Sequence, residues 1–149
     1  MKTTRDKDIE KLQENLYVIR RLAGWSAEDL GERIGVTKQT IRNLEKKNND
    51  AKMSKTQYIA IRAVLDYELA ENPDNVALKQ AIEILLDSED LSDDEKERVH
   101  VAVTAASGVA ASGVSSKETA EIMLSLLQGT IPLIATGGSW IARILSKTK

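Results

Sequence analysis

Four polar side chains between residues 38 and 43 have the chemistry needed to recognise nucleic acid. The amides of Gln39 and Asn43 can make paired hydrogen bonds to adenine, and Lys38 and Arg42 can reach guanine or a phosphate group. Such contacts require a rigid element that presents the four side chains together. The flanking sequence predicts an element of this kind.

Two short helices joined by a tight turn are predicted around these side chains. Ser26 is expected to cap the first helix and Thr37 the second, and Gly35 permits the turn between them. The second helix would turn its apolar residues inward and leave its polar N-terminal half outward. The residues expected to form the core of this unit and to fix its angle are Trp25, Leu30, Ile34, Gly35, Val36, Ile41 and Leu44.

Helical patterns continue on both sides of this unit. Apolar residues at spacings of three and four predict a helix over residues 9–22 that stops at Gly24. Ser54 begins a capping box for a fourth helix that ends near residue 69, and Asn72-Pro73 is expected to start a fifth. No segment alternates with period two for long enough to predict a strand. The sequence therefore predicts an all-α fold.

Three stretches of the sequence resemble the Cro/CI-type (XRE) helix-turn-helix family: Asn15–Arg21, Trp25–Gly31 and Gly35–Glu45. The resemblance covers about residues 9–70. It implies a five-helix, lambda-repressor-like domain that binds double-stranded DNA, as in phage repressors and bacterial transcriptional regulators. It also implies that the helix after Thr37 is the recognition helix, with Lys38, Gln39 and Asn43 reading the bases.

Further DNA contacts are expected around the recognition helix. Amides at the starts of the second and fourth helices can bind phosphates, because the positive end of a helix dipole lies there. The residues expected to contact phosphates or flanking groups are Ser26, Thr37, Thr40, Arg42, Lys46, Lys47, Ser54 and Lys55. Two positions depart from the family pattern. Ala27 replaces a Gln that often contacts phosphate and braces the recognition helix, and Gly31 replaces the commoner Ala, which slightly weakens its helix.

The net charge of -2 is unevenly distributed along the chain. Residues 1–70 hold 14 basic and 11 acidic residues, residues 71–100 hold 3 and 10, and residues 101–149 hold 4 and 2. The predicted DNA-reading region is thus mildly basic, and most of the acidic charge lies beside it. If about five phosphates are neutralised, log K falls with log salt at a slope of about -4 to -5.

Residue counts argue against several other kinds of chemistry. The chain has no Cys and one His, which excludes a disulfide framework, a thiol nucleophile and a metal site with two histidines from one chain. His100 is expected to be an ordinary helix residue at an apolar boundary. The acidic run 87–97 lacks the glycine and the ligand spacing of a Ca²⁺ loop. Neither a nucleophile–base pair nor a glycine-rich phosphate loop is present, so we expect no enzymatic activity, cofactor or metal.

The sequence leaves open the role of the C-terminal third. We expect a DNA-binding domain over residues 1–70, an acidic helical connector over 71–98 and an apolar helical module over 99–149. Residues 99–116 and 122–142 contain no Lys, Arg, Asp or Glu. Small residues and uncovered apolar surface favour oligomerisation, as a homodimer or a larger assembly. The two uncharged runs are also near the length of a membrane span, so membrane association is an alternative. Disorder until a partner binds is a third.

The sequence is consistent with two functions. The first is a sequence-specific DNA-binding transcriptional regulator, a repressor that acts as a homo-oligomer. Its expected location is the cytoplasm, at the nucleoid, because the N-terminal sequence has no apolar signal segment. The alternative is an effector that acts through its apolar tail on a partner or at the cytoplasmic face of the membrane. In that case the helix-turn-helix would serve autoregulation.

Overall fold

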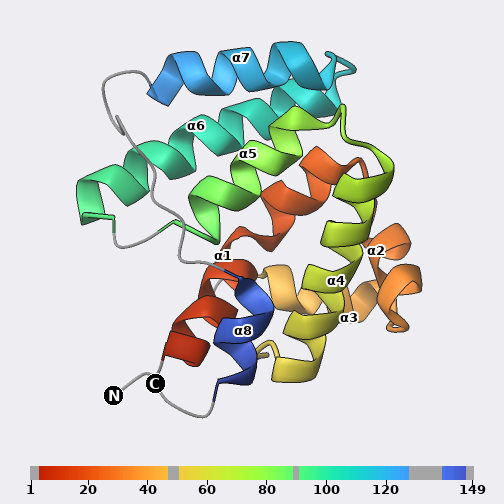
Figure 1. The fold of residues 1–149 in the computed structure, drawn as a ribbon. Coiled ribbons are helices and arrows are strands. Elements are labelled where there is room, and N and C mark those ends of the chain that lie inside the picture. The colour runs from red at the N-terminus through yellow and green to blue at the C-terminus, as the bar shows by residue number, and fades with distance from the viewer. Residues whose placement is uncertain (1–3, 47–50, 89–90, 128–138, 147–149) are drawn as a thin grey trace.

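The computed structural model describes residues 4–46, 51–88, 91–127 and 139–146, which form helices joined by short connections (Figure 1). In chain order the helices are α1 (Thr4–Ala23), α2 (Ala27–Ile34), α3 (Lys38–Glu45), α4 (Lys55–Glu71), α5 (Val76–Leu85), α6 (Asp93–Ala111), α7 (Ser116–Leu127) and α8 (Trp140–Leu145). The described ranges contain no β-strand. The prediction of an all-α fold is confirmed.

Side-chain caps explain where the helices around the predicted turn begin. The Ser26 hydroxyl accepts a hydrogen bond from the N–H of Asp29 at 3.0 Å, and the Asp29 carboxylate accepts one from the N–H of Ser26 at 2.9 Å. Thr37 caps α3 through a backbone N–H one turn later, and Ser54 forms a full capping box at the start of α4. These three caps confirm the predicted starts of the helices.

The fifth helix begins later than the sequence indicated. Asn72 ends α4, and α5 is capped by Asn75 instead of by the Asn72-Pro73 pair. The Asn75 amide donates to the carbonyl of Leu22 at 3.0 Å, and its Oδ1 accepts from the hydroxyl of Ser116 at 2.6 Å. Asn75 therefore joins the ends of α1, α5 and α7. The capping bond itself is local, because Asn75 accepts from the N–H of Leu78 at 3.2 Å, but its bonds to Leu22 and Ser116 join residues far apart in the sequence.

Helix α1 is the central element of the packing. Helices α2 and α3 pack against each other; α3 also packs against α1, and α2 against α4. Helices α5 and α6 pack against another part of α1, and α7 covers α5 and α6 (Figure 1). The buried apolar residues of all these helices belong to one core cluster. The predicted reading unit is thus attached through α1 to the C-terminal helices.

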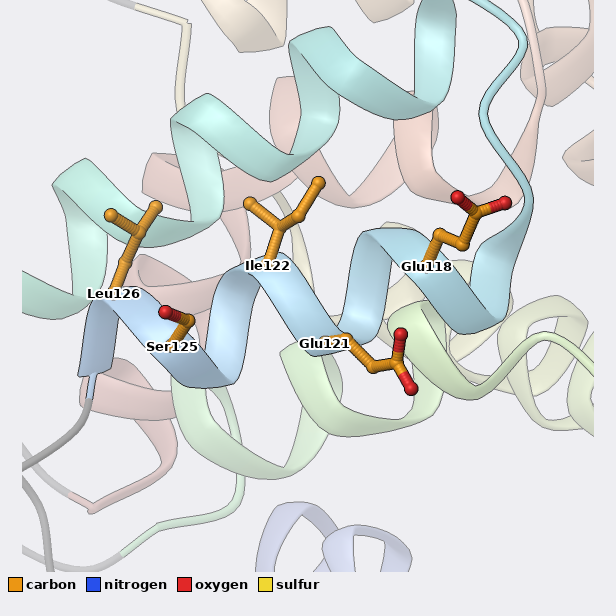
Figure 2. A pocket seen from close by; sticks show the side chains of 5 residues that line it. All are labelled: Glu118, Glu121, Ile122, Ser125 and Leu126. Carbon is orange, nitrogen blue, oxygen red and sulfur yellow. The ribbon is translucent and has the colours of Figure 1, made fainter.

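The C-terminal helices α6 and α7 bury one face each and expose the other. Val103, Ala106 and Met123 are fully buried, whereas Ile122, Leu124 and Leu126 on α7 are 38%, 48% and 51% exposed. A shallow, open depression on the outer side of α7 is lined by Glu118, Glu121, Ile122, Ser125 and Leu126 (Figure 2). His100 is exposed on α6. Among the residues that the structure describes, no helix has the length and apolar character needed to cross a membrane.

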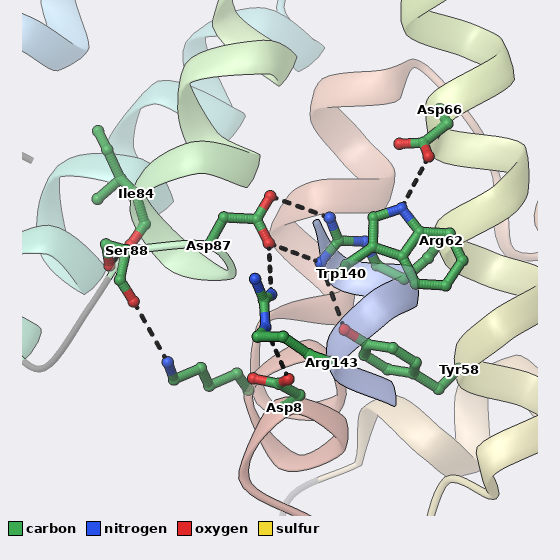
Figure 3. Close-up of polar contacts among 10 residues, drawn as sticks. Asp8, Tyr58, Arg62, Asp66, Ile84, Asp87, Ser88, Trp140 and Arg143 are labelled. Atoms are coloured by element: carbon green, nitrogen blue, oxygen red, sulfur yellow. Dashed lines mark hydrogen bonds and ion pairs between the residues drawn. The ribbon is translucent and has the colours of Figure 1, made fainter. Parts of the chain in front are cut away.

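A cluster of charged side chains docks α8 against α1 and α4 (Figure 3). Arg143 donates to Asp8 on α1 at 3.0 Å and to Asp87 after α5 at 2.9 Å. Asp87 also accepts two hydrogen bonds from Arg62 on α4, at 3.1 and 3.0 Å. Trp140 donates to the carboxylate of Asp66 on α4 at 2.7 Å and meets the ring of Tyr58 edge-on at 6.0 Å.

Candidate nucleic-acid interface

Helix α3 presents a polar outer face and an apolar inner face. Lys38, Gln39 and Arg42 are exposed, and Asn43 is half-buried. On the inner face, Ile41 is fully buried and Leu44 is 4% exposed. The side chains expected to read bases therefore share one short helix with those expected to anchor it, as residues at helical spacing must.

The two amides expected to read bases are linked to each other. The Nε2 of Gln39 donates to the Oδ1 of Asn43 at 2.9 Å, across one turn of α3. This bond orients the Gln39 amide along the helix. Gln39 retains its carbonyl oxygen and its second N–H, and adenine requires one donor and one acceptor of this kind. The free protein thus holds these side chains in a defined arrangement.

The turn between α2 and α3 is closely packed. Gly35 ends α2 with a φ of 81°, in the left-handed region that favours glycine. A Cβ at Gly31 would lie 2.6 Å from the carbonyl oxygen of Val36 and 3.2 Å from the carbonyl carbon of Thr37. The sequence alone predicts only that Gly31 slightly weakens its helix. The structure shows that its missing side chain lets the turn backbone approach α2.

An ion pair attaches the last residue of α3 to α1. Arg20 donates from Nε to Oε2 of Glu45 at 2.6 Å and from one Nη to Oε1 at 2.9 Å. Its other Nη donates to the carbonyl of Trp25 at 3.0 Å. The hydrogen bonds to Glu45 raise the pKa of Arg20, and burial opposes them. Sequence reasoning did not assign this pair, because two charges 25 residues apart leave no local pattern.

Comparison with known families agrees with this geometry. Residues 16–72 match a helix-turn-helix family model, a range that runs from the second half of α1 to just beyond α4. The chain contains a Cro/CI-type helix-turn-helix domain. In general terms it is a DNA-binding transcriptional regulator, whose partner is double-stranded DNA. Searches of curated proteins and of solved structures found no match to the chain.

The helix N-termini of the helix-turn-helix domain differ in charge. The first turn of α2 holds Glu28 and Asp29, and hydrogen bonds from Ser26 lower the pKa of Asp29, so this carboxylate stays ionised at neutral pH. The first turns of α3 and α4 contain no acidic residue and begin with Lys38 and Lys55. Phosphate binding is therefore electrostatically more favourable at α3 and α4 than at α2.

The predicted contact residues that carry hydroxyl groups lie at these N-termini. The Ser26 and Ser54 hydroxyls accept capping bonds, which leaves each hydroxyl its own hydrogen to donate. The Thr37 and Thr40 hydroxyl oxygens lie 3.0 Å apart. Lys46 is exposed at the end of α3, and Lys47 lies outside the described residues.

The structure also shows what Ala27 does in place of the Gln that is common in the family. Ala27 is 5% exposed, so the first residue of α2 packs inward and presents no polar group outside. The helix-turn-helix domain holds α3 in other ways, through the Arg20–Glu45 ion pair and through the close approach of the turn at Gly31.

The core residues predicted from the sequence differ in how deeply they are buried. Trp25, Leu30, Ile41 and Leu44 are buried, Ile34 and Val36 are half-buried, and Gly35 is exposed in the turn.

Proposed function

We propose that the chain is a sequence-specific repressor that binds double-stranded DNA as a homo-oligomer. In this proposal α3 is the recognition helix, and Lys38, Gln39 and Asn43 read the bases. The observation that carries it is the outward polar face of α3 on a helix whose inner face is fully packed. A bound oligomer would repress by occupying the promoter, which requires only the surfaces that bind DNA and join the subunits.

Phosphate contacts would come mainly from the positive side chains and amides near α3 and α4. The first-turn amides of a helix have no acceptor within the helix, and the Ser54 hydroxyl bonds that of Gln57, so the earlier amides of α4 are suited to an anion. Lys55 and Lys46 are exposed nearby, and Arg42 lies on the outer face of α3. With about five phosphates neutralised, the slope of log K against log salt is about -4 to -5.

Selection of bound duplexes from a random pool tests the recognition assignment. The wild-type chain should enrich one half-site sequence. Gln39→Ala should weaken binding to it by about 1–3 kcal/mol and relax the preference at one base position. Asn43→Ala should relax the preference there or at a neighbouring position. Lys79→Ala, an exposed change on α5, is the matched control and should leave affinity and preference unchanged. Unchanged binding in both α3 variants would refute the assignment.

Oligomerisation is proposed to use the C-terminal region, residues 71–149. The exposed apolar residues of α7 support this, because they would lose contact with water in an assembly. A dimer would place two copies of α3 in successive major grooves, about 34 Å apart, and the selected site would then be a palindrome. Leu126→Glu should shift the assembly toward monomer in sedimentation velocity, with Lys117→Glu as an exposed control on the same helix. A wild-type chain that sediments as a monomer at all concentrations would refute this part.

A further inference from the structure

The side chain of Gln13 on α1 connects the end of α3 to the residues that lead into α4. Its Nε2 donates to the carbonyl oxygen of Leu44 at 3.2 Å and to that of Ala51 at 2.8 Å. Its Oε1 accepts from the backbone N–H of Met53 at 2.9 Å. One half-buried amide therefore bonds to both ends of the connection between α3 and α4.

The pattern of these bonds specifies an amide of this length. The carbonyl of Leu44 is among the last of α3, where helix carbonyls have no partner within the helix. The same side chain must donate to two carbonyls and accept from one N–H. Gln does both, whereas Glu only accepts when ionised and Met does neither. A substitution that keeps the volume but removes these bonds therefore isolates their effect.

The position of this connection matters for DNA binding. Met53 directly precedes Ser54, the cap of α4, so the Gln13 bond fixes the start of the helix that carries Lys55. Bases and phosphates of a duplex have a fixed separation. A protein that contacts both must hold its recognition helix and its phosphate site at a matching distance. Gln13 and Arg20 are seven residues apart on α1, which places them about two turns apart on one face.

We propose that Gln13 is a positioning residue that sets the N-terminus of α4 relative to α3. It does not contact DNA itself. It acts by keeping the phosphate site of α4 at the distance that base reading by α3 requires. The inference rests on the proposed function and adds to it a residue outside the helix-turn-helix match, which begins at residue 16.

The test compares Gln13→Met with Gln80→Met in the full chain. Gln80 lies half-buried on α5, and its Oε1 is buried with no hydrogen-bond partner among the described residues, so its loss should leave DNA binding unchanged. In Gln13→Met, hydrogen exchange at the Met53 amide should accelerate at least about tenfold, because that amide loses its acceptor, while amides inside α1 keep their protection.

The DNA-binding arm measures affinity for the selected duplex at several salt concentrations. Gln13→Met should bind about tenfold more weakly, and its salt slope should become shallower by about 1 to 2, because phosphate contacts at α4 are lost. Its preference at the bases read by α3 should persist. Faster exchange at Met53 with unchanged affinity and slope would overturn the inference while the proposed function stands. Unchanged exchange at Met53 would overturn it directly. A wild-type chain that selects no duplex would overturn the proposed function, and the inference with it.

Discussion

Gly31 and Gly108 provide a matched test of the packing at the recognition turn. Both are glycines inside helices, in α2 and α6. A Cβ at Gly108 would have no atom within 4 Å, whereas at Gly31 it would lie 2.6 Å from the Val36 carbonyl oxygen. Replacing glycine by alanine inside a helix favours folding by about 0.5–1 kcal/mol when nothing obstructs the new methyl group. The same substitution should therefore have opposite effects at the two positions.

The magnitude at Gly31 follows from the space that the methyl group needs. Contacts of real Cβ atoms are essentially never shorter than 3.0 Å, so the Val36 carbonyl must retreat by about 0.4 Å. Overpacking of this kind costs about 1–3 kcal/mol. The helix-propensity gain is common to both variants, so the difference between them reports the steric cost alone. We expect Gly108→Ala to be stabilised by about 0.5–1 kcal/mol and Gly31→Ala to be destabilised by about 1 kcal/mol.

Urea unfolding at 25 °C, followed by circular dichroism, measures both variants against the wild-type chain. For a chain of this size, 1 kcal/mol corresponds to about 2–4 °C in Tm, which provides an independent check. The retreat of Val36 also moves Thr37, the cap of α3, so Gly31→Ala should weaken DNA binding and Gly108→Ala should not. Equal stabilisation by the two substitutions would refute the assignment of a close approach at Gly31.

Three further outcomes test other parts of the structure. Arg143→Met removes the cation between the buried carboxylate of Asp8 and the half-buried carboxylate of Asp87, and it should lower the free energy of unfolding in urea by about 2 kcal/mol. A loss under about 0.5 kcal/mol would mean that these ion pairs contribute no more than ordinary surface ion pairs. Burial raises the pKa of Tyr58, so its stabilisation is complete below about pH 10 and is lost as the pH rises through the folded pKa. Unfolding measured from pH 8 to 11 should therefore show a steeper loss in the wild-type chain than in Tyr58→Phe. Hydrogen bonds from Ser26 lower the pKa of Asp29, so its contribution is present above about pH 4 and is lost as the pH falls through the folded pKa. Asp29→Asn should flatten the acid limb of the stability profile, and an identical limb in both proteins would contradict that role.

The parts of the fold that depend on neighbours in sequence were predictable. Ser26, Thr37 and Ser54 cap helices because a hydroxyl reaches an amide three residues away, and sequence alone contains that pattern. The long-range bonds of Gln13 and Asn75 could not be assigned in this way. These bonds reach groups 31 to 53 residues away, and an isolated polar residue in a helical sequence gives no sign of such partners.

The outer face of α3 was predictable for a related reason. Ile41 and Leu44 fix which side of the helix is buried, and Lys38, Gln39 and Arg42 must then lie on the other side. The bond between Gln39 and Asn43 and the close approach at Gly31 were not predictable, because both depend on rotamers and backbone positions that only the folded chain determines.

The docking of α8 can form only late in the synthesis of the chain. Asp8 and Arg143 are separated by 135 positions in the chain. At about 5–20 residues per second, Asp8 is synthesised roughly 7–27 s before Arg143, which supplies its counter-charge. During that interval the residues of the helix-turn-helix domain are synthesised, but the Asp8 carboxylate has no counter-charge from α8. Products that terminate early never acquire it. We therefore expect prematurely ended chains to be less stable than the full chain and to be removed by proteases before they compete for DNA.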